Sequence, residues 1–293
     1  MKLNLEKAIE KAKKNKDATS KVYPLANGSP AASDRVGKAA AFKSQGQKPQ
    51  PAGPKWAAPE YSRTRRIDID KNTIRDNRCV SLMTDSANSR LYEVLRAQVQ
   101  LAARERNLRT IMITSADPGD GKTLTCINLA CSFAKSHHQT VLLVDADLKK
   151  QQVHQCLGIN SPHGLVDYLL GDRSIEECLI WPGIDKLVLL SGGQTLQDSS
   201  ELISSPMMSD FVQDVRNRYE DRFVFFDAPP VLAGADTMSL AQMVDGIILV
   251  AETGKTSKEN FQKAVDLLPR NKMIGVVMNR ETEVKSSSYY KYY

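Results

Sequence analysis

The chain has 293 residues, of which 41% are hydrophobic and 25% are charged. This apolar fraction is enough for a hydrophobic core and excludes a wholly disordered chain, and the length allows one or two domains. No apolar run reaches the ~18–20 residues that a membrane-spanning helix needs, so we expect a cytoplasmic protein.

The excess of positive charge belongs to the N-terminal segment 1–60. This segment holds 12 Lys and Arg against 5 Asp and Glu, a net charge of +7, whereas the segment 61–293 holds 28 against 29, a net charge of −1. A nucleic-acid-binding domain carries its basic surface on the folded part. We therefore expect no nucleic acid among the partners.

Residues 1–64 are expected to lie outside the folded core and to be largely disordered. Within residues 1–16, apolar side chains recur at helical spacing from Leu5 onward, which predicts a short basic amphipathic helix. Such a helix is either a frayed element without a role or a docking element for a partner or an anionic membrane face. Residues 22–60 hold six of the 13 prolines, which indicates a linker.

From residue 109 onward, short apolar runs alternate with helical stretches such as 122–135. The predicted strands are 110–114, 141–145, 187–190, 223–227, 246–251 and 273–278. Strands that are apolar throughout are covered by helices on both faces, so the sequence predicts an α/β fold with a doubly wound, mostly parallel sheet over residues 65–283. Ligands of such sheets bind at the carboxyl ends of the strands.

The segment 115–123 lies between the first of these strands and the helix 122–135. It matches the phosphate-binding loop pattern G-x-x-x-x-G-K-[ST], except that Ala116 replaces the first glycine. In such a P-loop, backbone N–H groups surround phosphate oxygens, Lys122 reaches the β- and γ-phosphates, and Thr123 offers its hydroxyl to Mg²⁺. The alternative is a chance glycine-rich turn. The predicted nucleotide-binding residues of the loop are Asp117, Pro118, Gly119, Asp120, Gly121, Lys122, Thr123 and Leu124.

Two further predicted strands end in carboxylates. Asp145 and Asp147 follow one strand and point the same way, because side chains alternate along a strand. Paired carboxylates become useful when they bind a divalent cation or capture a proton, and the alternative is a cap on the next helix. Asp227 ends another strand and suits Mg²⁺ coordination or water positioning. Together with the loop, these strand ends predict a nucleoside-triphosphate site.

The C-terminal residues 284–293 form a tail rich in tyrosine. Four of the nine tyrosines lie in the last five positions, after a run of serines, so we expect a flexible, accessible cluster. The alternatives are an adhesive aromatic patch or a terminal strand. The four tyrosines are Tyr289, Tyr290, Tyr292 and Tyr293.

With these motifs the chain resembles the bacterial tyrosine autokinases of exopolysaccharide loci, and most closely their cytoplasmic, exosortase-associated type. The likeness is close over about residues 88–293. The family's P-loop is matched by 116–123, its second motif by Asp145-Ala-Asp147, its third by 227–230, and its substrate cluster by the tyrosine tail. A further echo is Asn279, which in related folds contacts the adenine.

The resemblance implies transfer of the γ-phosphoryl group of ATP to the tail tyrosines, by an enzyme that regulates exopolysaccharide synthesis, export and chain length. It implies ATP and Mg²⁺ as cofactors, with Thr123, Asp147 and Asp227 at the metal and Asp145 as the candidate base. The implied catalytic residues are Lys122, Asp145, Asp147 and Asp227.

The resemblance also implies partners. A membrane polysaccharide copolymerase (a chain-length-determinant protein) is expected as activator, recruiting the kinase to the inner face of the cell membrane, and a cognate tyrosine phosphatase is expected to reverse the reaction. A ring-shaped homo-oligomer is expected through Arg90, Glu93 and Arg96, whose charge order departs from the family's Glu-x-x-Arg-x-x-Arg.

A second departure concerns the residues after the Asp-x-Asp pair. The family usually has Arg and then Pro, whereas this chain has Lys149, Lys150 and Gln151. Lysine keeps the charge but loses the two-pronged hydrogen bonding of arginine.

The main alternative is a partitioning or septum-site type switch ATPase without kinase activity, which shares the fold. Such ATPases carry a second P-loop lysine that reaches across a dimer, and Asp117 stands at that position here. A third alternative, a non-catalytic binding module, leaves three intact motifs without chemistry.

Overall fold

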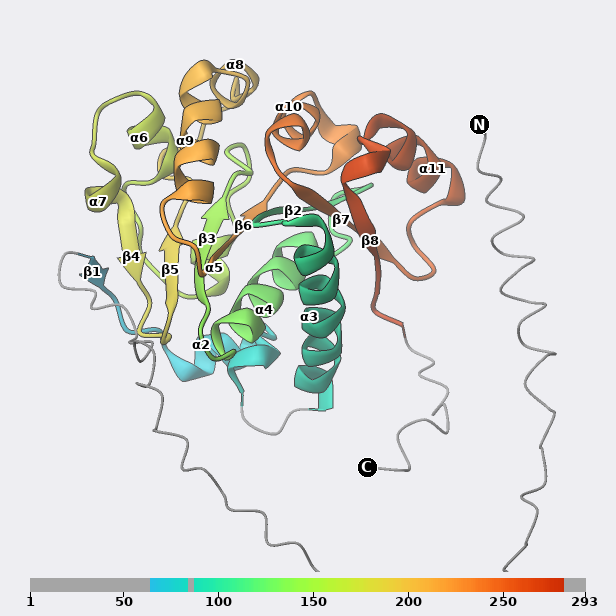
Figure 1. The fold of residues 1–293 in the computed structure, drawn as a ribbon, viewed down its shortest axis with the longest axis horizontal. Coiled ribbons are helices and arrows are strands. Elements are labelled where there is room, and N and C mark those ends of the chain that lie inside the picture. Colours follow the sequence, from blue (N-terminus) through green and yellow to red (C-terminus); the bar gives the residue numbers. More distant parts are fainter. Residues whose placement is uncertain (1–63, 84–86, 282–293) are drawn as a thin grey trace, which may run out of the picture. The chain divides into compact units, whose positions relative to one another are not determined.

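The structure, a computed structural model, describes residues 64–83 and 87–281 (Figure 1). The predicted N-terminal helix, the linker and the tyrosine cluster lie outside the described residues. Within the described part, eight strands form one sheet in the order β1-β4-β5-β3-β6-β2-β7-β8.

All six predicted strands are present, each within about one residue of its expected bounds. They are β2 (Thr110–Ser115), β3 (Thr140–Asp145), β5 (Leu187–Leu190), β6 (Arg222–Asp227), β7 (Gly246–Glu252) and β8 (Met273–Asn279). Every neighbouring pair among them runs parallel. The predicted mostly parallel sheet is therefore confirmed.

Two short strands extend the sheet beyond the prediction. β4 (Leu179–Trp181) pairs antiparallel with β5, and β1 (Arg65–Arg66) pairs parallel with β4. Runs of two or three residues carry no readable periodicity, since their pairing is decided by the neighbouring strand.

Helices cover both faces of the sheet (Figure 1). One hydrophobic cluster joins alternate strand residues such as Ile111 and Leu143 to α2, α3, α4 and α5. The other joins Met112 and Leu142 to α6, α8, α9, α10 and α11. The helices are α2 (Lys71–Asp76), α3 (Ala87–Arg106), α4 (Lys122–Ala134), α5 (Val153–Cys156), α6 (Leu165–Leu169), α7 (Ile175–Cys178), α8 (Ser200–Ile203), α9 (Pro206–Asn217), α10 (Asp236–Met243) and α11 (Lys258–Leu267).

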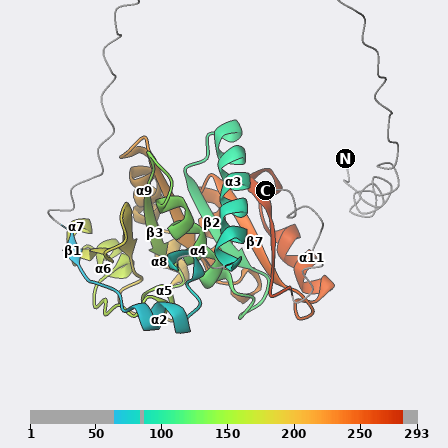
Figure 2. The same ribbon diagram turned by 90° about the horizontal axis from the view of Figure 1, so that it is seen from below.

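The segment before α3 is part of this fold. Figure 2 shows α2 beside α5, where the Asn77 side-chain amide donates to the Cys156 carbonyl at 2.9 Å. The Ser81 backbone N–H donates to Asn128 of α4 at 2.8 Å. Residues 64–83 thus brace the helix that follows the P-loop.

The expectation that every strand is covered on both faces is wrong for β8. Val276 is 44% exposed and Met278 is 54% exposed. As the last strand of the sheet, β8 has a neighbour on one side only, and its apolar residues lie at the border of the core. No helix within the described residues combines the length and the apolar character that crossing a membrane requires.

Candidate nucleotide-binding and phosphoryl-transfer site

The P-loop closes tightly between β2 and α4. Gly119 and Gly121 adopt the left-handed backbone region, with φ of +86° and +94°. A Cβ at Gly121 would lie 2.0 Å from the Asn279 side-chain nitrogen, so only glycine leaves room for the end of β8. Asn279 in turn donates to the Asp120 carbonyl at 2.8 Å. The structure therefore brings the predicted loop residues and Asn279 together.

The three predicted motifs meet at one lysine. Lys122 Nζ lies 2.9 Å from Asp147 Oδ2 and 3.6 Å from Asp227 Oδ2. The Thr123 hydroxyl donates to Asp227 Oδ2 at 2.6 Å. All four side chains are buried, so a bound phosphate would meet charges that water screens only weakly.

These charges perturb one another. Burial lowers the pKa of Lys122, but the neighbouring carboxylates, Asp227 first and then Asp147, raise it by more and keep the ammonium protonated. Burial raises the pKa of Asp227, and Lys122 with the Thr123 hydroxyl offsets this only in part. Perturbed carboxylates of this kind mark functional sites.

The site fits a magnesium ion bound together with nucleotide. Asp227 Oδ1 is buried and accepts no hydrogen bond from any described residue, whereas its Oδ2 accepts the Thr123 hydroxyl and shares the Lys122 ammonium with Asp147. Carboxylate and hydroxyl oxygens are the hard ligands that Mg²⁺ prefers. Among the residues that the structure describes, no three His, Cys, Asp or Glu side chains gather as a ready metal site. Mg²⁺ here would take its other ligands from phosphate and water, as it usually does.

Asp145 is fixed more firmly than Asp147. Its Oδ2 accepts the N–H groups of Gln152 and Val153 at 3.1 and 3.0 Å, and its Oδ1 accepts that of Asp147 at 3.2 Å. Burial, followed by the charge of Asp227, raises the pKa of Asp145 to about 8. Asp145 thus holds the loop that carries Asp147. Its bonds to the N–H groups of Gln152 and Val153 also agree with the alternative prediction, a carboxylate that caps the next helix, α5.

Asp117 stands at the P-loop position where switch ATPases carry their second lysine, and its side chain is bound within its own chain. Both oxygens of Asp117 accept hydrogen bonds from the Asn260 side chain of α11, at 2.9 and 3.1 Å. A carboxylate anchored in this way supplies no positive charge to the phosphates of a second subunit.

The predicted oligomer contacts lie on α3. Arg90 and Glu93 are exposed. Arg96 is half-buried and donates to the Ser132 carbonyl of α4 at 2.6 Å, so this arginine also joins two helices of its own chain. The four tail tyrosines lie outside the described residues.

One charged cluster at this edge of the sheet was not predicted as part of the site. Lys149 Nζ lies 3.3 Å from Asp236 Oδ1, and the hydroxyls of Ser199 and Ser200 donate to the two oxygens of Asp236. The sequence singled out Lys149 only as a departure from a family pattern. Its partner gave no signal, because an aspartate in the first turn of a helix is common.

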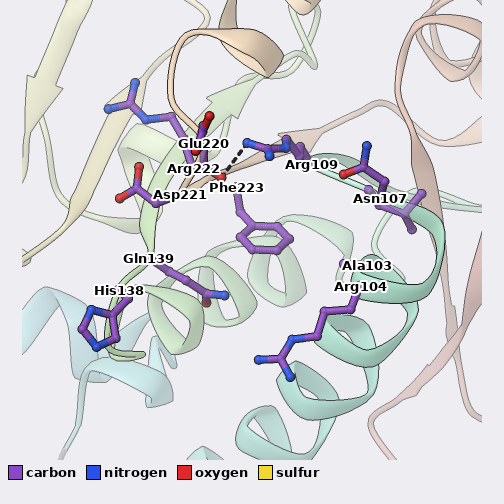
Figure 3. A pocket seen from close by; sticks show the side chains of 11 residues that line it. Ala103, Arg104, Asn107, Arg109, His138, Gln139, Glu220, Asp221, Arg222 and Phe223 are labelled. Carbon is purple, nitrogen blue, oxygen red and sulfur yellow. Dashed lines mark hydrogen bonds between the residues drawn. The ribbon is translucent and has the colours of Figure 1, made fainter. Parts of the chain in front are cut away.

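A hollow of about 270 Å³ lies elsewhere, at the amino ends of β2 and β6 (Figure 3). Arg104, Arg109, His138 and Arg222 are among its lining residues, and Arg109 donates to the Glu220 carbonyl at 2.5 Å. Because the P-loop follows the carboxyl end of β2, this hollow is separate from the nucleotide site.

Several known proteins are similar to this chain in sequence and fold. A protein-family model described as an AAA domain matches residues 108–273. Tyrosine-protein kinase YwqD of Bacillus subtilis (strain 168) is 37% identical over 219 residues, which cover 73% of this chain and 91% of that protein. The crystal structure of the VpsO kinase domain is similar with a TM-score of 0.58 at 32% identity, covering 66% of this chain and 98% of that one. The septum site-determining protein MinD of Pyrococcus horikoshii OT3, complexed with Mg-ADP, has a TM-score of 0.50 at 22% identity over 59% of this chain and 71% of its own, a likeness of fold alone.

Proposed function

This chain belongs to the bacterial tyrosine-protein kinases, and on that premise we propose that it transfers the γ-phosphoryl group of ATP to its own C-terminal tyrosine cluster. The observation that carries the proposal is the position of Lys122. Its ammonium lies between two carboxylates at the start of a P-loop helix, and one of these has a buried oxygen that no described residue hydrogen-bonds. This arrangement suits a polyphosphate bound together with a divalent cation.

The chain's own groups position the nucleotide. Backbone N–H groups of residues 117–124 and the Lys122 ammonium hold the phosphates, and Asn279 fixes the loop from the nucleoside side. Thr123, Asp147 and Asp227 would hold Mg²⁺, which when bound neutralises charge on the β- and γ-phosphates. Phosphoryl transfer depends on such positioning and neutralisation more than on covalent chemistry.

The acceptor hydroxyl needs a base, because the pKa of a free tyrosine is about 10. We assign this role to Asp145, which ends β3 two residues before the proposed Mg²⁺ ligand Asp147. Asp145→Asn should then abolish transfer, and it should lower the transfer rate far more than it weakens Mg-ATP binding. Asp147→Asn should instead weaken Mg-dependent ATP binding, and the reverse pattern would exchange the two roles.

The cellular role follows from the family resemblance. We propose that the kinase regulates exopolysaccharide synthesis and chain length as a member of the exosortase-associated type. In this proposal a separate membrane polysaccharide copolymerase activates it at the inner face of the membrane, and a cognate phosphatase reverses the reaction. The net charge of +7 over the segment 1–60 supports docking at an anionic membrane face. The proposed domains are 1–64, 65–283 and 284–293.

The direct test is incubation of the purified full chain with Mg-ATP, with and without membranes, followed by mass spectrometry of phosphotyrosine. We expect phosphate on Tyr289, Tyr290, Tyr292 and Tyr293, lost in Lys122→Met. The matched control is Lys135→Met, an exposed lysine just beyond the other end of α4, which should behave as wild type. ATP hydrolysis without any phosphotyrosine would identify a switch ATPase instead.

A mixing experiment tests the proposed oligomer. Lys122→Met chains that keep their tyrosines are mixed with active chains whose four tail tyrosines are Phe. Phosphate should appear on the inactive chain, and the assembly should become smaller as each phosphate adds about −1.5 to −2 charges. Absence of transfer in this mixture would confine the reaction to single chains, and an unchanged size would exclude dissociation.

A further inference from the structure

A second lysine lies at the same edge of the sheet as the P-loop. Lys149 belongs to the turn that begins at Asp147, closed by a hydrogen bond from the Lys150 N–H to the Asp147 carbonyl at 3.1 Å. Its ammonium lies 3.3 Å from Asp236 Oδ1, and its side chain is 34% exposed. Lys149 is therefore held at this edge but remains open to solvent.

Asp236, the partner of Lys149, is held in place by two serines. Asp236 is only 2% exposed and begins α10. Although burial raises the pKa of Asp236, the hydroxyls of Ser199 and Ser200 together with Lys149 lower it below the usual value. The serines already hold both oxygens, so the carboxylate stays in place when the ammonium moves. An ammonium has three donor hydrogens, and within the part of the chain that the structure describes Lys149 donates to Asp236 alone, so two of them remain available.

The order of the strands gives the direction of the bound nucleotide. Asn279 at the end of β8 donates to the Asp120 carbonyl of the P-loop at 2.8 Å, whereas the carboxylates that suit Mg²⁺ end β3 and β6, on the other side of β2. The phosphate chain thus runs from the β7–β8 side toward the β6–β3 side, with the γ-phosphate last. In-line transfer brings the acceptor oxygen from the side opposite ADP, which is the side that Lys149 and Asp236 border.

The acceptor side needs a positive charge. Lys122 is already bracketed by Asp147 and Asp227, and the phosphotyrosine product carries about −1.5 to −2 charges. Mg²⁺ would share its charge with Asp147 and Asp227, so a further cation would offset the three carboxylates of Asp145, Asp147 and Asp227 beside which the product forms. A lysine is suited to follow a moving phosphoryl group, because it binds phosphate as a flexible point charge.

We propose that Lys149 is a further catalytic residue of the tyrosine-kinase reaction, contacting the γ-phosphoryl group as it passes to the acceptor and then the phosphotyrosine product. In this step the tyrosine oxygen forms a bond to the γ-phosphorus, and the bond from that phosphorus to the β–γ bridging oxygen breaks. ADP leaves with that electron pair, and the phenol proton goes to the base carboxylate. The Lys149 ammonium exchanges Asp236 for the phosphoryl oxygens and returns when the product departs. The assignment rests on the proposed function.

The test uses full-length donor chains with Phe at the four tail positions and Lys122→Met full-length chains as acceptors. Lys149→Gln in the donor should slow transfer roughly 100-fold, the effect of removing one preorganised charge-stabilising group, while the Kd for Mg-ATP stays within about twofold. Lys149→Arg should recover most of the rate, since it restores the charge. Lys150→Gln, the exposed neighbour, is the matched control and should transfer like wild type.

A structural role makes a different prediction. If Lys149 served only to neutralise Asp236, adding Asp236→Asn to the Lys149→Gln variant would remove the unpaired charge and restore transfer, and we expect no such rescue. We expect Asp236→Asn to cost less than about tenfold, because Lys149 remains present. Rescue of transfer in the double variant, or a Lys149→Gln rate within about threefold of wild type, would overturn the assignment. If wild-type chains formed no phosphotyrosine, the proposed function itself would fail.

Discussion

The two edges of the parallel sheet use aspartate in opposite ways. At the amino edge, Asp245 Oδ2 accepts the backbone N–H groups of Arg109 and Thr110 at 2.9 and 3.0 Å. Arg216 Nε lies 2.9 Å from its other oxygen. Although burial raises the pKa of Asp245, these donors lower it below the usual value. This carboxylate is fully satisfied inside the chain.

At the carboxyl edge the balance is reversed. Burial keeps the pKa of Asp227 above its usual value, and its Oδ1 accepts no hydrogen bond from residues 64–83 or 87–281. A carboxyl whose pKa is raised on folding lowers stability above its unfolded pKa, whereas one whose pKa is lowered adds stability there. The comparison teaches that Asp245 at the amino edge stabilises the fold, whereas Asp227 at the carboxyl edge gives up stability for a ligand.

Asp227→Asn should produce the largest effect, because it removes the destabilising charge at the carboxyl edge. We expect phosphoryl transfer to fall about 10²–10³-fold. At pH 7 the free energy of unfolding without ligand should rise by about 1 kcal/mol, because the variant removes a poorly solvated charge and leaves Lys122 paired with Asp147. Urea unfolding and the phosphotyrosine assay measure the two changes. Asp266→Asn, on the exposed part of α11, is the charge-matched control, and a destabilised Asp227→Asn protein would contradict the interpretation.

Asp245→Asn should do the reverse. In the wild type, both oxygens of Asp245 accept hydrogen bonds, from the backbone N–H groups and from Arg216. The amide of the variant would place an N–H group against one of these donors, so the free energy of unfolding should fall by about 1–3 kcal/mol. The Kd for Mg-ATP and the transfer rate of the folded protein should stay within about twofold, since Asp245 lies at the edge away from the P-loop. A loss of transfer without a loss of stability would show that the two edges are coupled.

The pH dependence sharpens the same contrast. Because the pKa of Asp245 is lowered on folding, its stabilisation is present above the unfolded value of ~3.9 and is lost as the pH falls through the folded value. The difference in unfolding free energy between wild type and Asp245→Asn should therefore be constant between pH 7 and 5 and shrink below about pH 4. Urea titrations at several pH values measure it, and a difference independent of pH would rule out the charge as its cause.

The sequence predicted the carboxyl edge better than the rest of the fold. Continuous apolar runs ending in Asp145, Asp227 or a glycine-rich loop combine two strong signals, a buried strand and a polar strand end. β4 escaped prediction because its three residues pair antiparallel with β5 only once that strand is in place. Asp236 escaped because its serine partners are 36 and 37 residues away in the chain, a proximity that only the folded sheet creates.

Removal of residues 1–60 should have the smallest effect on ATP binding and stability. It tests whether the contrast between the two edges depends only on the residues after 60. Every hydrogen bond described at either edge comes from residues 109–279, so the Kd for Mg-ATP and the free energy of unfolding should match those of the full chain. Removal of residues 1–83 is the informative contrast, because it also deletes the buried Ile74 and Cys79 and the Ser81 bond to Asn128 of α4. Loss of those apolar contacts should lower the free energy of unfolding by several kcal/mol, at about 2–5 kcal/mol for a large buried side chain. Calorimetric ATP titration and urea unfolding of both truncations give the answer. If the protein without residues 1–60 no longer binds ATP, the domain boundary lies before residue 60.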